Sequence, residues 1–393
     1  MGNKIKATII GSGISGVTTA YYLARKGYEV TIVERERYAA MGTSYANGGQ
    51  LSASNAETWN SWGNVKKGIK WMFREDAPLK ISPWPELAKI GWMARFIANI
   101  PNKNQNTLET CKLALKAHDL YKSIAEEESI EFDKVEKGII HIYRNEKELQ
   151  HARKINELYK KAGLDRREVT AQEMRQIEPA LDQSESPIIG GFYNEQDFTG
   201  DIHLFCRNLS STLKQKYGVK FIHLPATIYD IEMFSSLGVV VICAGVESVS
   251  LAKYVGDRLP IYPVKGYSIT INDPKSAPWV SLLDDETKIV SARLGESRFR
   301  VAGTAEFAGK NLDIMRARIQ PLENWSRTLF PEMNTDSIVP WAGLRPMTPS
   351  MMPIVRQSRK NRNVYYNTGH GHLGWTLSAA TASQITKIIE TTQ

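Results

Sequence analysis

The stretch KIKATIIGSGISGVTTAYYLARKGYEVTIVE, residues 4–34, decides the fold. A short apolar run, Ala7–Ile10, precedes a loop with glycines at positions 11, 13 and 16, and a helical pattern follows from Val17 to Lys26. A second apolar run, Glu29–Val33, ends at an acidic residue, Glu34. Continuous apolar runs of this length are typical of buried parallel strands. The stretch therefore predicts a strand–helix–strand unit of an α/β fold.

Each glycine of the loop has a physical reason. Gly11 allows a tight turn out of the strand, Gly13 lets the backbone approach a pyrophosphate, and Gly16 lets the helix pack close to the sheet. The helix start offers unpaired N–H groups to phosphates, and a carboxylate after the second strand suits a ribose 2′-hydroxyl. The alternative is a glycine-rich turn in another α/β protein. We predict a dinucleotide site formed by Ile10, Gly11, Gly13, Ile14, Ser15, Gly16, Glu34 and Arg35.

Composition sets bounds on the class of protein. The chain has 393 residues, of which 42% are hydrophobic and 23% charged, as in soluble globular proteins of two or three domains. Three widely spaced cysteines argue against a disulfide framework and against a zinc site, so we predict no metal. No apolar run reaches the ~18 residues of a membrane span, and no signal peptide is visible. We expect a cytoplasmic location.

The charge balance leaves a membrane partner open. The formal net charge is +8, which fits a soluble enzyme with many surface lysines or attraction to an anionic membrane surface. A dense basic stripe is missing from the sequence, so we expect no nucleic-acid partner. Residues 56–104 are rich in tryptophan, and residues 86–100 have the pattern of a basic amphipathic helix. Such a helix either faces the core or rests at the inner face of the cell membrane.

Several further segments carry a family resemblance. They read TSYANGGQLS at 43–52, KWMFREDAPLKI at 70–81, PVKGYS at 263–268, RVAGTAE at 300–306, WAGLRPMTP at 341–349 and NTGHGHLGWT at 367–376. Together with the glycine loop, these segments resemble the bacterial D-amino acid dehydrogenases, FAD enzymes of the glycine oxidase and D-amino acid oxidase superfamily. The resemblance covers nearly the whole chain.

The resemblance implies a fold and a domain order. We expect a Rossmann-type FAD-binding domain with an inserted α+β substrate domain of mixed sheet. The FAD-binding domain would comprise residues 1–60, 196–255 and 336–393. The substrate domain would comprise residues 61–195 and 256–335.

The resemblance also implies a reaction. A D-amino acid would lie against flavin N5, and its Cα hydrogen would leave as hydride, so that hydrolysis yields a 2-oxo acid and ammonia. We choose Arg345 for the substrate carboxylate, because a guanidinium holds a carboxylate by two charge-assisted hydrogen bonds. Tyr267 near that carboxylate and Tyr45 on the flavin face are further catalytic candidates, with core packing as the alternative for both. Related sarcosine oxidases hold flavin through a cysteine, and since none lies between 335 and 350, we expect non-covalent FAD.

The remaining cofactor residues follow from the same resemblance. The helix after Trp375 would direct its N-terminal N–H groups at the flavin pyrimidine and stabilise an anionic reduced flavin. The Ala-Gly turn after the strand at 238–243 would contact the dinucleotide. The predicted flavin contacts are Thr43, Ser44, Gly48, Gly49, Gln50, Ala244, Gly245, Arg345, Gly371, His372, Leu373, Gly374, Trp375 and Thr376.

Some positions depart from the family pattern. Relatives insert a β-meander before the strand at 238–243, whereas only Tyr229–Leu237 stand there in this chain. Ser350 and Arg356 replace residues that are usually Asp and Gly. Two other functions therefore stay open, an oxygen-using oxidase of glycine, sarcosine or a proline derivative, and an FAD-binding protein of low turnover. The resemblance favours a quinone or another electron-transfer partner as the acceptor.

Overall fold

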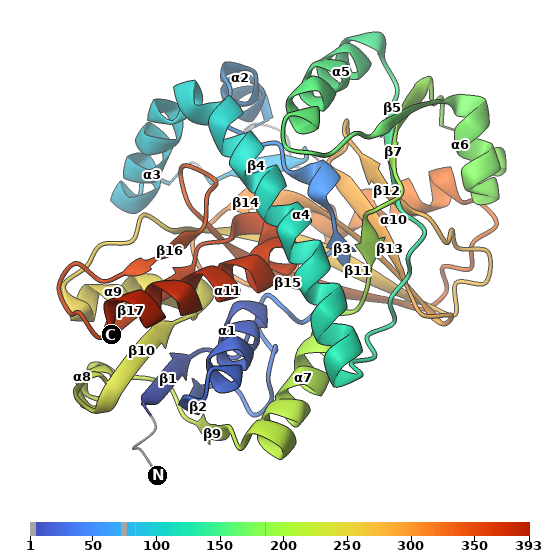
Figure 1. The fold of residues 1–393 in the computed structure, drawn as a ribbon. Helices are drawn as coiled ribbons and strands as arrows, with labels where there is room; N and C mark the ends of the chain where they lie inside the picture. Colours follow the sequence, from blue (N-terminus) through green and yellow to red (C-terminus); the bar gives the residue numbers. More distant parts are fainter. Residues whose placement is uncertain (1–4, 72–76, 83, 185) are drawn as a thin grey trace.

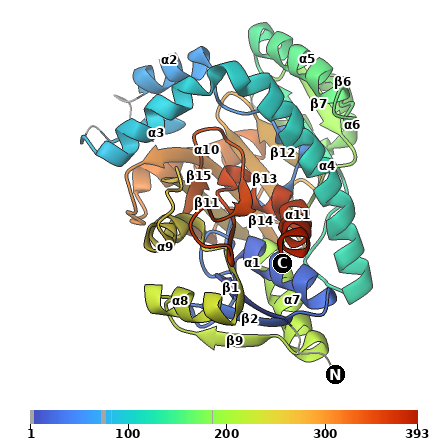
Figure 2. The same ribbon diagram turned by 60° about the vertical axis from the view of Figure 1, so that its left-hand side comes forward.

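The computed structural model describes residues 5–71, 77–82, 84–184 and 186–393. Within these ranges two main sheets form, with the first below the second in the views of Figures 1 and 2. The first sheet has the order β16 (Ile354–Gln357), β17 (Val364–Thr368), β10 (Gly238–Ile242), β1 (Lys6–Ile10), β2 (Glu29–Glu34) and β9 (Lys220–His223). Neighbouring strands in this sheet are parallel to each other, except that β16 is antiparallel to β17. The predicted strand–helix–strand unit is confirmed.

Helices cover both faces of the first sheet. On one face lie α1 (Ile14–Arg25), α4 (Lys103–Glu128), α7 (Ile202–Tyr217) and α11 (Gly374–Thr392). On the other face lie α8 (Ile228–Leu237) and α9 (Ser248–Val255). Strand β1 is central, and Ile9 pairs with Val241 on one side and Ile32 on the other. This sheet draws its strands from three separate parts of the chain, as a dinucleotide domain with insertions requires.

A helix stands where the family resemblance leads one to expect a β-meander. The side chain of Thr227 accepts from the Asp230 backbone N–H, and the Asp230 carboxylate accepts from the Thr227 backbone N–H at 2.7 Å. This capping box starts α8. Ile231 of α8 is buried against the first sheet, so the short segment closes the connection between β9 and β10 without a further strand.

The second sheet is mixed. Its order is β15 (Ile338–Met347), β11 (Tyr262–Asn272), β14 (Arg298–Phe307), β13 (Ile289–Leu294), β12 (Ser281–Asp284), β5 (Ile139–Tyr143), β7 (Gly190–Asn194) and β6 (Arg167–Thr170), with β4 (Leu79–Ile81) beside β14. Helix α10 (Arg316–Leu329) packs on one face through Ile319 and Leu322. Strand β15 belongs to this sheet, although it falls in the segment 336–393 that we assigned to the FAD-binding domain.

Smaller elements surround the two sheets. They are the ribbon β3 (Gln50–Leu51) and β8 (Phe198–Thr199) and the helices α2 (Trp62–Trp71), α3 (Leu87–Ala98), α5 (Glu146–Lys160) and α6 (Ala171–Ile177). Helices α2 and α3 lie side by side at the end of the molecule farthest from β9 (Figures 1 and 2). Among the described residues, no helix is both long and apolar enough to cross a bilayer.

Candidate active site

A cavity of about 1770 Å³ lies between the carboxyl ends of the first-sheet strands and one face of the second sheet. This volume exceeds the roughly 300–1,000 Å³ of a site for one small ligand, so a dinucleotide and a substrate fit together. All the cofactor residues predicted from the sequence line this cavity, with the exception of Gly16. The fold therefore brings residues from six segments of the sequence to one cavity.

The three fingerprint glycines have different reasons in the structure. Gly11 has a φ of +101°, and a Cβ there would lie 2.8 Å from the Cys243 carbonyl oxygen. A Cβ on Gly16 would lie 1.9 Å from the Gly11 carbonyl oxygen, so this glycine serves helix packing. A Cβ on Gly13 would meet only the Ser44 hydroxyl, at 3.4 Å. The fold itself does not need a glycine at position 13, and the space beside it faces the cavity.

The start of α1 is open to an anion. Its first turn holds no acidic residue, and its N-cap, Gly13, has no side chain that could cap the helix. The Ile14 N–H donates to the Ser44 hydroxyl at 3.2 Å, and Ser15 lines the cavity beside it. Unpaired N–H groups at a helix start favour phosphate. These residues therefore fit a pyrophosphate.

Glu34 is fixed at the cavity rim. Its Oε2 accepts from the Ser12 N–H at 2.7 Å and from the Ser12 hydroxyl at 2.6 Å, while Oε1 accepts from the Glu36 N–H at 3.0 Å. A carboxylate held in this way at the end of β2 suits a ribose hydroxyl. Arg35 also lines the cavity, but its Nε pairs with Glu36 at 3.2 Å.

The loop at 43–50 forms a flat wall. Thr43 donates to the Leu344 carbonyl at 2.7 Å, which ties the loop to β15. A Cβ on Gly48 would lie 2.7 Å from Val290, and Gly49 has a φ of +72°. The Gln50 amide donates to the Ser281 hydroxyl at 2.7 Å, so its side chain points into the second sheet and its backbone faces the cavity. This close backbone approach fits a planar ring.

The segment 371–376 forms the opposite end of the wall. The His372 ring stacks on Trp59 with 4.6 Å between ring centres. Burial and the nearby cations Arg345 and Lys288 lower the pKa of His372 to about 3, so the imidazole is neutral. The Trp375 side chain turns into the core against Tyr121, so this residue contributes backbone to the cavity. Thr376 accepts from the Ser52 N–H at 3.3 Å and donates to the Gln50 carbonyl at 3.5 Å.

Arg345 lies flat on the cavity face of the second sheet. Its guanidinium donates to the carbonyls of Thr304 at 2.8 Å and Gly303 at 3.5 Å. A Cβ on Gly266 would lie 2.2 Å from that guanidinium, which explains the glycine of the PVKGYS segment. Burial lowers the pKa of Arg345 to about 10, and no carboxylate of the described residues pairs with it. A half-buried cation with free donors on a cavity wall suits a carboxylate ligand.

The two tyrosine candidates do not join Arg345. The Tyr267 hydroxyl donates to Glu306 at 2.6 Å and lies in the core under α10, on the opposite face of the sheet. Burial and Glu306 raise its pKa. Tyr45 is exposed, and its ring contacts His203 with 5.0 Å between ring centres. Arg356, a departure from the family, lies outside the cavity and faces Asp257 at 3.9 Å.

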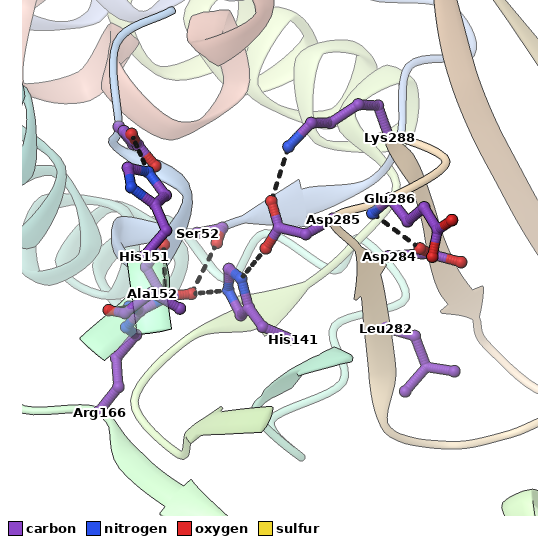
Figure 3. Close-up of polar contacts among 12 residues, drawn as sticks. Ser52, His141, His151, Ala152, Arg166, Leu282, Asp284, Asp285, Glu286 and Lys288 are labelled. Atoms are coloured by element: carbon purple, nitrogen blue, oxygen red, sulfur yellow. Dashed lines mark hydrogen bonds and ion pairs between the residues drawn. The ribbon is translucent and has the colours of Figure 1, made fainter. Parts of the chain in front are cut away.

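A polar chain that the sequence did not reveal lines another wall. His141 of β5 bonds to the Ser54 hydroxyl through Nε2 at 2.7 Å and lies 3.7 Å from Asp285 through Nδ1. Asp285 pairs with Lys288 at 2.7 Å (Figure 3). Burial alone would raise the pKa of Asp285, but Lys288 and His141 hold it well below its usual value. Burial lowers the pKa of His141.

Another buried carboxylate anchors this row of hydrogen-bonded polar side chains. Asp197 accepts from the Ser54 hydroxyl at 2.5 Å, from the Ser52 hydroxyl at 3.1 Å and from the Ala53 N–H at 2.8 Å. The network thus joins residues 52–54, which follow the loop at 43–50, to β5 and to the turn before β13. All five residues of β5 are buried, so the sequence of this strand carries no alternation that would have singled out His141.

Comparisons with known proteins identify the family of the chain. The sequence profile described as FAD dependent oxidoreductase matches residues 6–388. The chain is 50% identical to "D-amino acid dehydrogenase 3" of Mesorhizobium japonicum, over 98% of this chain and 97% of the relative. It is 38% identical to "D-amino acid dehydrogenase" of Paramagnetospirillum magneticum, over 98% and 95%.

Solved structures agree on the fold. A glycine oxidase from Geobacillus kaustophilus has a TM-score of 0.76 at 19% identity and covers 99% of this chain and 96% of its own. The L-proline dehydrogenase from P. horikoshii has a TM-score of 0.74 at 17% identity, over 100% and 94%. The residues of the cavity fit the cofactor that the profile names, with room at Gly13, open N–H groups at α1 and a flat wall at 43–50. The chain belongs to the family of FAD-dependent oxidoreductases.

Proposed function

We propose that this protein is an FAD-dependent D-amino acid dehydrogenase. The observation that carries the proposal is Arg345, whose half-buried guanidinium on the cavity face has only backbone carbonyls as hydrogen-bond partners among the described residues. An α-amino acid supplies the missing carboxylate. This chain covers nearly the whole length of two relatives named D-amino acid dehydrogenase, to which it is 50% and 38% identical.

The protein's own residues bind and orient the substrate. Arg345 holds the carboxylate, and the sheet face around Gly266 gives it a rigid floor. His372 and Trp59 close the wall beside it, and the neutral imidazole adds no second charge to compete for the carboxylate. Holding the Cα–H bond in one orientation removes much of the entropic barrier. Tyr267 is better assigned to core packing, and Tyr45 to the protein surface.

The bound FAD supplies the acceptor for the substrate hydride. The amino acid gives up two electrons and two protons to become an imino acid. Water then adds to the carbon–nitrogen double bond, which releases the 2-oxo acid and ammonia. We propose non-covalent attachment, because all three cysteines are buried and Cys243, which lines the cavity, lies under the fingerprint glycines rather than beside Arg345.

We further propose a lipid-soluble quinone as the final electron acceptor and the cytoplasmic face of a membrane as the working place. The net charge of +8 supports attraction to anionic lipid. The cavity also continues from the site into an apolar part under α2 and α3.

The test is anaerobic reduction of the bound flavin across a panel of D- and L-amino acids. D-alanine or D-proline should bleach the yellow colour, and the L-enantiomers should not. In air, a dehydrogenase should form little peroxide with D-alanine. Fast peroxide formation with glycine or sarcosine would instead assign an oxidase, and a flavin that no amino acid bleaches would contradict both.

A further inference from the structure

His141 lies in a row of polar side chains whose hydrogen atoms can be assigned by counting donors and acceptors. The row runs from Asp197 through the Ser54 hydroxyl and the His141 ring to Asp285. The carboxylates at its two ends only accept hydrogen bonds, and a serine hydroxyl has a single hydrogen to donate. The 2.5 Å contact from Ser54 to Asp197 uses that hydrogen. Ser54 therefore accepts from His141, and Nε2 of the ring carries the hydrogen of that 2.7 Å bond.

The other ring nitrogen of His141 is left to accept a proton. Burial lowers the pKa of His141, so the imidazole rests in its neutral form and Nδ1 carries a lone pair. That lone pair faces Oδ2 of Asp285 across 3.7 Å, which is longer than a hydrogen bond. A proton added to Nδ1 would turn this contact between two acceptors into a charge-assisted hydrogen bond. The opposite tautomer would satisfy Asp285 but leave Ser54 and Asp197 at 2.5 Å with no hydrogen between them.

Charged groups of both signs surround the pair of His141 and Asp285. The elements packed against the pair contribute a second carboxylate, two cations and a phenol, namely Asp197, Arg166, Lys288 and Tyr143. Lys288 donates to Asp285 at 2.7 Å, and Arg166 donates to the Ser54 carbonyl at 3.5 Å. The two carboxylates offset the two cations, so their charges do not hold the ring permanently protonated.

Asp285 shares a stretch of cavity wall with the proposed carboxylate site. It lies between Lys288 and the His141 ring (Figure 3), and 23% of its side chain is exposed, so a ligand in the cavity can reach it. Arg345 donates to the Gly303 carbonyl at 3.5 Å, and a Cβ on Gly303 would lie 3.2 Å from the Lys288 carbonyl oxygen. A cation for a carboxylate and an anion for an ammonium group therefore stand on neighbouring strands of one wall.

We propose that Asp285 binds the ammonium group of the substrate and that His141 takes up one of its protons at Nδ1. This inference rests on the proposed function. An ammonium nitrogen has no lone pair to support the positive charge that develops as the Cα hydrogen leaves as hydride, so one N–H bond breaks first. The proton passes through the Asp285 carboxylate to His141, and the amine becomes neutral. The proton returns to solvent after the 2-oxo acid has left.

The test follows the reduction of the bound flavin in the holoenzyme by saturating D-alanine, without air, from about pH 6 to about pH 10. Asp285→Asn removes the carboxylate. His141→Gln keeps an amide donor for Ser54 but cannot take up a proton. The control is Glu286→Gln, which removes the same charge from the next residue, outside the cavity lining. The FAD content of each variant is measured from its absorbance.

At pH 7 the flavin of Asp285→Asn should be reduced about a hundredfold or more slowly than that of the wild type, because a general base contributes about this much. The deficit should shrink as pH rises past the pKa of the substrate ammonium, where the amine is already neutral. His141→Gln should follow the same course, and Glu286→Gln should match the wild type at every pH.

A deficit that stays constant with pH would overturn the proposal, because a purely structural role slows the reaction at every pH alike. Wild-type rates at pH 7 in Asp285→Asn or His141→Gln would overturn it as well. If one of these variants purifies without FAD, the other decides by the same measurement, and loss of FAD from both would assign the pair to the fold instead. A wild type whose flavin no D-amino acid reduces at any pH would refute the proposed function.

Discussion

At the scale of single residues, we predict that Arg345 decides substrate binding. Arg345→Ala should lower kcat/KM for D-alanine by a factor of about thirty or more, since truncating one partner of a buried charged pair costs about 2–5 kcal/mol. FAD should remain bound. Steady-state kinetics with Arg356→Ala as the control tests this, because Arg356 lies outside the cavity. An unchanged Michaelis constant for Arg345→Ala would show that another residue holds the carboxylate.

Gly266 is the second residue that the geometry singles out. A methyl group at this position would stand 2.2 Å from the guanidinium carbon of Arg345, so Gly266→Ala should push the arginine off the sheet. We expect a raised Michaelis constant for D-alanine together with retained FAD. Gly91→Ala is a suitable comparison for expression and folding, because a Cβ there meets no atom within 4 Å and the residue lies inside helix α3, away from the cavity lining. Normal kinetics for Gly266→Ala would contradict the role of this glycine.

At the scale of elements, the loop before α1 separates ligand binding from folding. Gly13→Val should give a folded, colourless protein, because the space it fills faces the cavity and its backbone φ of −67° suits any residue. Gly16→Val should instead destabilise the fold, because its Cβ would meet the Gly11 carbonyl at 1.9 Å. The flavin absorbance and the thermal midpoint of the two variants measure these effects. A yellow Gly13→Val protein would contradict the loop assignment.

Some helices and strands could be predicted from the sequence, and others could not. The fingerprint unit was predictable because glycine positions and apolar runs act locally, within residues 4–34. Helix α8 was not predicted. The segment Tyr229–Leu237 is too short for a β-meander, and that shortness drew attention away from the capping residues Thr227 and Asp230. The sequence left Tyr267 between the site and the core, because a strand residue reaches either face and only pairing with β14 and β15 sets which one.

The polar wall of the cavity lay beyond local patterns. His141, Asp285 and Asp197 come from three segments whose contact depends on the order of strands in the second sheet. Arg345 was predicted because a family motif surrounds it, and no motif surrounds His141. A single histidine in an apolar strand gives no indication of its partners until the neighbouring strand β12 is known to lie beside it.

At the scale of the whole molecule, buried imidazoles link stability to pH. Burial lowers the pKa of His370 to about 4, and its Nε2 bonds to Thr381 at 2.9 Å. A histidine in the unfolded chain has a pKa of about 6.5. Between the two pKa values the unfolded chain therefore binds a proton that the folded chain does not bind. Stability is therefore full above about pH 6.5 and falls as pH drops towards the folded pKa, by about 1.4 kcal/mol per pH unit for this residue.

His370→Gln should remove this part of the pH dependence. Denaturant unfolding with excess FAD, measured from pH 7 to pH 4.5, should give a shallower decline for the variant than for the wild type. The variant is also expected to be less stable at pH 7, because the bond to Thr381 is altered. Equal slopes for the two proteins would show that His370 takes up its proton in the folded state.

The order of strands in the first sheet governs how the chain is made. Strand β10 pairs with β1 from the start of the sequence and with β17 from residues 364–368, and α11 packs on α1. On the ribosome, the amino-terminal fingerprint unit must wait for more than three hundred later residues before its sheet and its helical layer are complete. The nascent protein therefore holds an unfinished core until residues 354–392 have been made, and we expect cofactor capture to follow their synthesis rather than that of the glycine loop.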